Sequence, residues 1–311
     1  MGAIDQAQFN FNPPISMAIA LMVGFLVFAV SLDLAWNNLR TVLRRPRAPL
    51  VGLFAQLLLL PAVAFIIGLV MCDTPSIALG LILVACCPAG ALSNYLSGVA
   101  GGSIATSVAM TAISTSLSVV VTPISFLFWA GLNPLTNAVL TSITIDPVRI
   151  AVVFLVMLII PVTAGMSLRA IRPGIADAIR IGVRRLAGAV FAVVVTVLLL
   201  GNIGVVAGFA STTLLPVLVA FSAAVALGWS LARVSGLEAS DRRAVTIEVA
   251  FQNVALAVGL AVSFFPSMAG VAITSILWGV VHLTIGSGIA ALWSWIPLEE
   301  RGSDRSLTKT A

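Results

Sequence analysis

Seven polar residues lie inside stretches of sequence that are otherwise apolar. They are Gln56, Ser93, Asn94, Ser107, Thr111, Glu248 and Gln252. Glu248 supplies one negative charge, and the other members supply neutral amide and hydroxyl oxygens. Such ligands suit a hard monovalent cation, because soft metals prefer thiolate or imidazole and calcium prefers several carboxylates. The residue types therefore indicate a cation site built around a single carboxylate.

One row of hydroxyl groups repeats every four residues. Its members are Ser103, Ser107, Thr111 and Thr115. This spacing places them along one face of a helix, although serine and threonine in apolar helices most often serve as packing contacts. Glu248 follows Arg243 by five residues and is alternatively an interfacial partner of that arginine. An ionised carboxylate at membrane depth costs about 2.5–3.5 kcal/mol, which only a partner would offset.

The composition places these residues in a membrane protein. The chain has 311 residues, of which 60% are hydrophobic and 9% are charged, and its mean hydropathy is +1.16. Soluble domains carry about 25% charged residues, so a soluble enzyme, a disordered protein and an ordinary nucleic-acid binder are excluded. No charge occurs in residues 74–145, 186–232 or 249–298. A spanning helix needs about 20 apolar residues, so each stretch accommodates two or more spans.

The apolar runs predict nine membrane-spanning helices. They are 15–36, 50–71, 76–97, 103–130, 148–168, 186–209, 213–233, 244–265 and 269–296. With this count, only Arg149 of the 16 basic residues falls on the opposite side from the others. Cytoplasmic loops are enriched in Lys and Arg. We therefore expect an all-α polytopic protein of the cell (inner) membrane, with residues 1–14 outside, a membrane domain over 15–297, and a cytoplasmic tail over 298–311.

The Arg-rich stretch 169–185 permits two interpretations. Ile171, Ile175 and Ile179 recur every four residues and would line one face of a helix on the cytoplasmic leaflet. Pro173 and Gly174 argue against a long helix. A loop that only sets the topology is the alternative.

Two of the expected spans contain interruptions. Pro88 and Gly90 break 76–97, and freed backbone at membrane depth survives only inside protein or facing a wet cavity. Glu248, Gln252 and Asn253 form a polar interruption in 244–265. The two spans are five apart and so cross the membrane in opposite directions. This pattern is typical of an inverted-repeat transporter, here with a first repeat that lacks its opening helix. Without a nucleotide-binding loop, redox motif or catalytic triad, the residues indicate a cation-coupled secondary transporter.

Two motifs resemble those of the bile acid:sodium symporter family. They are Cys86-Cys87-Pro88-Ala89-Gly90-Ala91-Leu92-Ser93-Asn94 and Ile247-Glu248-Val249-Ala250-Phe251-Gln252-Asn253. Their order and spacing, with the hydroxyl-rich segment between them, are similar to the family along residues 10–297. The nine-span count resembles that of the animal bile-acid carriers, whereas the better-known bacterial members have ten spans.

The resemblance implies a fold of two parts and two sodium sites. A panel domain would comprise 15–36 and 148–209, and a core domain 50–130 and 213–296, in which the two discontinuous helices cross. One sodium site would use Ser93, Asn94, Ser107, Thr111 and Glu248. The other would use Gln56, Glu248, Gln252 and the backbone carbonyls of Val249 and Phe251. Glu248 would thus take part in both sites.

The resemblance also indicates where a substrate would bind. The expected contacts are Ala91, Asn253, His282 and Leu283. A threonine near the substrate in some members is Ala91 here, an asparagine expected after His282 is Leu283, and the usual Pro-Gly-Gly is Pro88-Ala89-Gly90. These departures leave the sodium ligands in place and alter the substrate region. A bile acid, another steroid-like or sulfonated anion, and a small carboxylate such as pantoate therefore all stay open.

The sequence thus predicts a sodium-coupled symporter of an organic anion that works by alternating access in the lipid bilayer. Its expected ligands are Na⁺ and the anion, with no catalytic residues, no nucleic acid and no protein partner implied. One alternative is a proton-coupled exporter of an anion or arsenite with a related fold, in which Cys86 and Cys87 would bind soft ligands. Another is a channel or receptor-like membrane protein without coupled flux.

Overall fold

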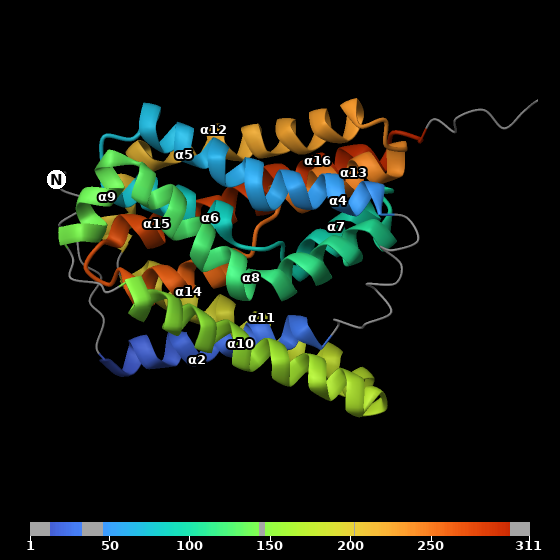
Figure 1. Cartoon of the computed structure of the whole chain (residues 1–311), viewed down its shortest axis with the longest axis horizontal. Coiled ribbons are helices and arrows are strands. Elements are labelled where there is room, and N and C mark those ends of the chain that lie inside the picture. Colours follow the sequence, from blue (N-terminus) through green and yellow to red (C-terminus); the bar gives the residue numbers. More distant parts are fainter. Residues whose placement is uncertain (1–12, 33–45, 143–146, 202, 299–311) are drawn as a thin grey trace, which may run out of the picture.

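The computed structural model describes residues 13–32, 46–142, 147–201 and 203–298 (Figure 1). Most of the expected N-terminal segment and tail lie outside these residues, as do Arg40, Arg44, Arg45 and the basic residues of the tail. Within the described residues every regular element is a helix, which confirms the all-α prediction.

The elements run in chain order from α2 to α16 and include two π-helical turns, η1 and η2. They are α2 (Pro13–Ser31), α4 (Arg47–Phe54), η1 (Ala55–Leu59), α5 (Leu60–Met71), α6 (Pro75–Cys86), α7 (Ala91–Val99), α8 (Ile104–Leu132), α9 (Pro134–Ser142), α10 (Pro147–Ile171), α11 (Pro173–Gly201), α12 (Ile203–Val234), α13 (Ala239–Ala250), α14 (Val254–Phe264), α15 (Ala269–Val281), η2 (His282–Gly286) and α16 (Ser287–Ser294).

Several of these helices have the length and apolarity of membrane spans. Among the described residues, Arg47–Met71, Ile104–Leu132, Ile203–Val234 and Ala269–Ser294 are long and apolar enough to cross a membrane. Pro75–Cys86 and Val254–Phe264 are shorter apolar helices because the spans that contain them are broken. The chain is therefore a helical membrane protein.

The connection between the sixth and seventh expected spans lies earlier than predicted. α11 ends at Gly201 and α12 begins at Ile203, so the expected span 186–209 is divided between two helices. The hydroxyls of Thr212 and Thr213 both donate to the carbonyl of Phe209 at 2.9 Å. Because this bonding satisfies the hydroxyls within the helix, α12 continues through them. The low helix propensity of Gly201 marks the end of α11 instead.

The Arg-rich stretch 169–185 is helical on both sides of Arg172. α10 continues to Ile171, and α11 begins at Pro173 and runs without a break to Gly201. Proline is well tolerated as the first residue of a helix, where its missing N–H is not needed. Pro173 therefore starts a long helix here, contrary to the expectation that it would prevent one. The ion pair of Arg169 with Asp177 joins the two helices across the turn, and Arg180 pairs with the same carboxylate within α11.

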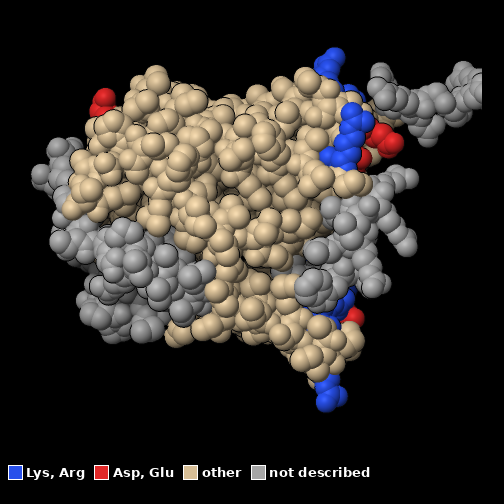
Figure 2. Space-filling view, viewed as in Figure 1, with Lys and Arg blue, Asp and Glu red and all other residues tan. Residues whose placement is uncertain are grey.

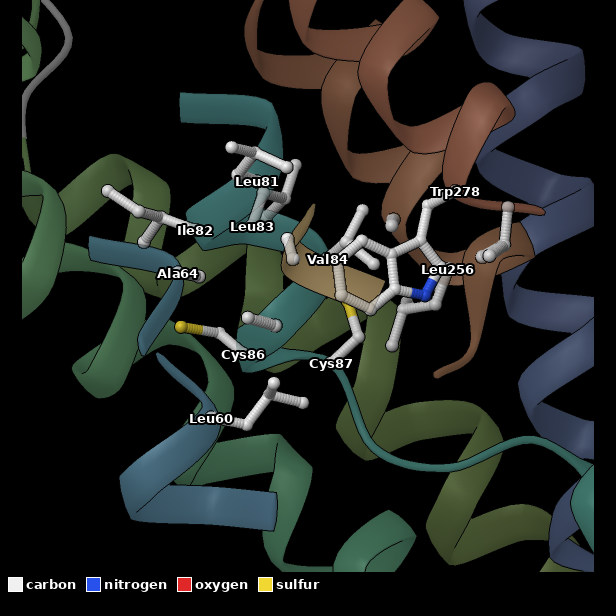
Figure 3. Close-up of a cluster of buried hydrophobic side chains, with 14 of the residues drawn as sticks. Leu60, Ala64, Leu81, Ile82, Leu83, Val84, Cys86, Cys87, Leu256 and Trp278 are labelled. Carbon is white, nitrogen blue, oxygen red and sulfur yellow. The ribbon is translucent and has the colours of Figure 1, made fainter. Parts of the chain in front are cut away.

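The helices form two groups (Figure 1). α2, α10 and α11 lie together along one side, and α2 also packs against α14 of the larger group. Every residue of α6 is buried. Figure 3 shows its side chains Leu81, Ile82 and Val84 among residues of α5, α14 and α15, with Trp278 beside them. The three cysteines are free, buried thiols, as expected for cysteines inside apolar segments.

Charged side chains are confined to the ends of the molecule on the face drawn in Figure 2. The described Lys and Arg residues on this face gather at one end, and a broad uncharged surface separates them from the other end. This distribution fits a protein whose middle lies in hydrocarbon, where exposed charge is costly.

Candidate cation site at two broken helices

The first break separates α6 from α7. α6 ends at Cys86, and Cys87 and Gly90 both have extended backbone. Pro88 has no N–H to donate to a carbonyl of the preceding turn, and Gly90 two residues later weakens the helix further. α7 then begins at Ala91.

The second break separates α13 from α14. Asn253 is the N-cap of α14, and its Oδ1 accepts a hydrogen bond from the Leu256 N–H at 3.0 Å. The Gln252 Nε2 donates to the carbonyl of Val249 at 2.7 Å, near the end of α13. Side-chain amides thus replace helical hydrogen bonds on both sides of this break.

The two breaks meet each other. Ala89 and Gln252 form an isolated antiparallel β-bridge, and the Asn253 N–H donates to the Pro88 carbonyl at 2.8 Å. Backbone groups that a helix would have satisfied are therefore paired across the crossing, as membrane depth requires. The crossing brings together the C-terminal ends of α6 and α13 and the N-terminal ends of α7 and α14.

Beside the crossing, Glu248 lies in a cluster of oxygens with no exposed surface of its own. The Ser107 hydroxyl donates to Oε1 of Glu248, and the Thr111 hydroxyl lies 2.9 Å from Oε2. Both hydroxyls also contact Asn94 Oδ1, at 2.9 and 3.1 Å. Ser93 contacts the carboxylate as well, and its hydroxyl donates to the Gly90 carbonyl at 2.6 Å. α7, α8 and α13 thus supply one site.

This cluster holds more hydrogen-bond acceptors than hydroxyl hydrogens to donate to them. Ser107 and Thr111 each approach Asn94 Oδ1 and one carboxylate oxygen of Glu248. A hydroxyl has a single hydrogen, so each of the two residues satisfies only one of its two acceptors at a time. The remaining close oxygens repel one another unless a positive charge lies among them. The arrangement therefore fits a bound cation of high oxygen affinity.

A second set of oxygens lies on the backbone side of Glu248. Gln56 is fully buried in η1, and its Nε2 donates to the Glu248 carbonyl at 3.2 Å. Pro61 follows η1 and has no N–H to donate to Leu57 four residues back, where the helix is wider than an α-helix. The Oε1 atoms of Gln56 and Gln252 are buried and have no hydrogen-bond partner among the described residues. Buried amide oxygens without donors are the ligands that an alkali cation uses.

Arg243 does not pair with Glu248, so the interfacial alternative for Glu248 is wrong. The Arg243 guanidinium donates to the carbonyls of Ala100, Trp293 and Ile296 at 2.7–2.9 Å. These carbonyls lie at the C-terminal ends of α7 and α16, where the helix dipole favours a positive charge. Spacing in the sequence could not reveal this arrangement, because its partners are backbone atoms far away in the chain.

The hydroxyl row and the expected substrate residues occupy different surroundings. In the row, Ser103 caps α8, and Thr115 is buried with no hydrogen-bond partner among the described residues. His282 is 7% exposed and stacks on Phe251 with ring centroids 4.9 Å apart. The next side chain, Leu283, is 53% exposed, so the structure does not bury it with His282.

Asn253 and Ala91 lie at the crossing. Asn253 Oδ1 is engaged in capping α14, and Ala91 is the first residue of α7. Sequence reasoning missed Asp241, whose Oδ1 accepts from the Thr106 hydroxyl at 2.6 Å. Its position seven residues before Glu248, on the same face of α13, was the available signal.

Comparison with known proteins identifies the family. The model of the sodium bile acid symporter family matches residues 20–209. The uncharacterized sodium-dependent transporter YocS of Bacillus subtilis is 29% identical over 288 residues, which are 90% of this chain and 84% of that protein. The human ileal sodium/bile acid cotransporter is 27% identical over 266 residues, covering 81% and 72%.

A plant relative is similar over much of the same region. The probable chloroplastic sodium/metabolite cotransporter BASS2 of Oryza sativa subsp. japonica is 29% identical over 272 residues, covering 87% of this chain and 62% of that protein. These relatives are named as transporters or cotransporters rather than enzymes. Because the family model covers more than half of the 311 residues, the chain belongs to the sodium bile acid symporter family.

Proposed function

We propose that this chain is a symporter that couples the movement of sodium to that of an organic anion. The observation that carries the proposal is the buried Glu248 carboxylate between the hydroxyls of Ser107 and Thr111. One carboxylate among neutral oxygens suits a hard monovalent cation better than calcium or a soft metal.

Two sodium ions would share Glu248. The first would lie among the Glu248 carboxylate, Ser93, Asn94, Ser107 and Thr111. The second would lie near the Glu248 backbone, where Gln56 and Gln252 each have a buried Oε1 that accepts no hydrogen bond from the described part of the chain. The carbonyls of Val249 and Phe251 would complete that second site.

Coupling would act through the crossing. The first site joins Asn94 of α7 to Glu248 of α13, and the second joins Gln56 of η1 to Gln252 in the break. Sodium would therefore hold together elements that otherwise repel through their oxygens. The substrate would bind where the N-terminal ends of α7 and α14 meet, with Asn253, His282 and Ala91 nearby. Helix N-terminal ends carry partial positive charge, which favours an anion.

The larger architecture follows the family resemblance. Residues 50–130 and 213–296 would form a core, and residues 15–36 and 148–209 a panel against which the core moves. The chain would cross the cell (inner) membrane nine times, with spans arranged in inverted repeats. The distribution of arginines would place its N-terminus outside and its C-terminus in the cytoplasm. The grouping of α2, α10 and α11 supports the panel.

Soft-ligand export receives no support from the cysteines. The Cys86 thiol contacts Ser125 at 3.4 Å, and Cys86 and Cys87 are buried in the apolar packing of Figure 3. The described groups that contact the Glu248 carboxylate are oxygens, which supports sodium rather than arsenite as the ligand.

A thermal-shift screen tests the proposal. The purified protein would be melted with a panel of organic anions in sodium chloride and in matched choline chloride. We expect sodium alone to raise the melting temperature and one class of anions to raise it further only when sodium is present. A melting temperature that is the same in sodium and choline would overturn the proposal.

A further inference from the structure

A cavity of about 440 Å³ opens between the first turns of three helices. Residues 46–49 line it at the start of α4, and residues 236–238, 240 and 241 line it at the start of α13. From α8 the lining residues are Ser103, Ala105, Thr106 and Ala109. Arg47, Arg242 and Arg243 lie at this end of the molecule, which the nine-span prediction places on the cytoplasmic side. No residue proposed to bind sodium or the anion lines the cavity.

Two of these helices, α8 and α13, carry oxygens of the cluster farther along, and η1, which continues α4, carries Gln56 of the second set. α4, α8 and α13 all pack against one another. Asp241 lines the cavity, and Glu248 follows it by seven residues on the same face of α13. At 1.5 Å per residue, the two carboxylates are about 10 Å apart along the helix. Thr106 lines the cavity and directly precedes Ser107 of the cluster.

An apolar contact lies between the cavity-lining residues and the proposed sodium sites along two of these helices. Gly52 lies between Pro49 and Gln56, and Val245 lies between Asp241 and Glu248. The fully buried Met110 side chain of α8 packs on Gly52 beside Val245. A Cβ atom built on Gly52 would collide with the Met110 thioether and would lie 3.3 Å from Val245 Cγ2. The Met110 side chain therefore occupies the space that the missing side chain of Gly52 leaves. Methionine is unbranched and flexible, so this closure can open without movement of the backbone.

Charged groups of both signs border the cavity. The N-terminal ends of α4, α8 and α13 and the side chain of Arg47 oppose a positive ion. Glu238 and Asp241 offset these charges, and Asp241 is bonded to Thr106 across the seam between α8 and α13. Ser103 donates to the same threonine hydroxyl at 3.0 Å.

We propose that this cavity is the vestibule through which sodium reaches and leaves the cluster on the cytoplasmic side, and that Met110 packed on Gly52 is the plug between them. The inference rests on the proposed function, because it takes sodium as the bound ion. It assigns Met110 a kinetic role, since the plug lies on the route and supplies no ligand oxygen.

Met110→Ala tests the plug in the purified, full-length protein. Stopped-flow dilution would give the sodium dissociation rate from intrinsic tryptophan fluorescence, and a sodium titration would give Kd. We expect dissociation to accelerate about tenfold, which corresponds to a barrier lower by about 1.4 kcal/mol. Association should accelerate equally, so Kd should stay unchanged. A ligand or a purely structural residue would instead change Kd.

Met22→Ala is the matched control, because Met22 is a buried methionine on α2 and lies outside the contact of α4, α8 and α13. Equal sodium rates in Met110→Ala, Met22→Ala and the unaltered protein would overturn the inference while leaving sodium binding intact. Absence of sodium binding in the unaltered protein would instead refute the proposed function.

A second variant keeps the test decisive if Met110→Ala does not fold. Ala105 is exposed and lines the cavity, so Ala105→Cys would be modified with a cationic methanethiosulfonate reagent. The attached charge should slow both sodium rates at constant Kd. The unaltered protein, whose three thiols are buried, controls for reaction elsewhere. Unchanged rates after complete modification of Ala105→Cys would contradict the vestibule.

Discussion

At Glu248 the charge and the shape of the side chain can be separated by substitution. Glu248→Gln keeps the shape and removes the only carboxylate of the cluster. We expect it to abolish the sodium-dependent rise in melting temperature and coupled uptake, while the protein still inserts into the membrane. Thr111→Ala should weaken sodium binding less, because it removes one neutral oxygen that water is able to replace.

Sodium-dependent melting of the two variants provides the measurement. Glu248→Gln retaining the full sodium response would remove the carboxylate from both proposed sites. A larger loss in Thr111→Ala than in Glu248→Gln would also contradict the central role of the charge.

Gln56 isolates the second proposed site. Gln56→Leu removes a buried Oε1 for which the described residues supply no donor, and leaves the side-chain oxygens around the Glu248 carboxylate in place. We expect a sodium titration of this variant to lose cooperativity and to follow a single-site curve, because one of two linked ions no longer binds. The titration would use the melting temperature as its readout, and an undiminished cooperative curve would argue against a second ion at Gln56.

The sequence predicts part of this site and leaves the rest hidden. Ser107 and Thr111 are one helical turn apart, and that spacing predicts that they share a face of the helix. Their contact with Glu248, which the structure shows, was implied by the family resemblance rather than by the spacing. The same spacing also included Ser103 and Thr115, which lie elsewhere, because periodicity gives a face of a helix and no depth along it. The carbonyl partners of Arg243 lie at the C-terminal ends of α7 and α16, which meet α13 only in the folded protein.

At the scale of elements, the N-cap of α14 controls one side of the crossing. Asn253→Ala removes the oxygen that accepts from Leu256, and an N-cap contributes about 0.5–2 kcal/mol. We expect a lower melting temperature in the absence of sodium. Asn253→Ser keeps a capping oxygen and should recover most of the loss. If the serine variant melts as early as the alanine variant, the role of Asn253 in capping is wrong.

The elements were most predictable where the backbone itself carries the signal. Pro88 removes an N–H and Gly90 adds backbone freedom, and the two together favour a break at this position, whereas α8, α10 and α12 continue through single prolines. The end of α11 was misplaced because Thr212 and Thr213 are polar yet bond back to Phe209 inside α12. Hydroxyl residues are compatible with both a turn and a helix, and the neighbouring packing decides between them.

At the scale of the whole molecule, the arginine distribution makes a prediction about topology. Fifteen of the 16 basic residues fall on one side of the nine-span arrangement, since only Arg149 falls on the other. We expect a reporter fused after Ala311 to be active in the cytoplasm and a reporter before Met1 to be active outside. A C-terminal reporter that is active only outside would exclude the nine-span topology.

The lone carboxylate of the cluster also decides which step of a transport cycle feels the membrane potential. With both proposed cations and a monovalent anion bound, the charges of Glu248 and its ligands sum to zero, whereas the empty carrier retains one negative charge. A potential of 100 mV acts on one elementary charge with about 2.3 kcal/mol. A negative interior would therefore drive the empty binding site back toward the outside, where it reloads, and each turnover would carry one net positive charge inward.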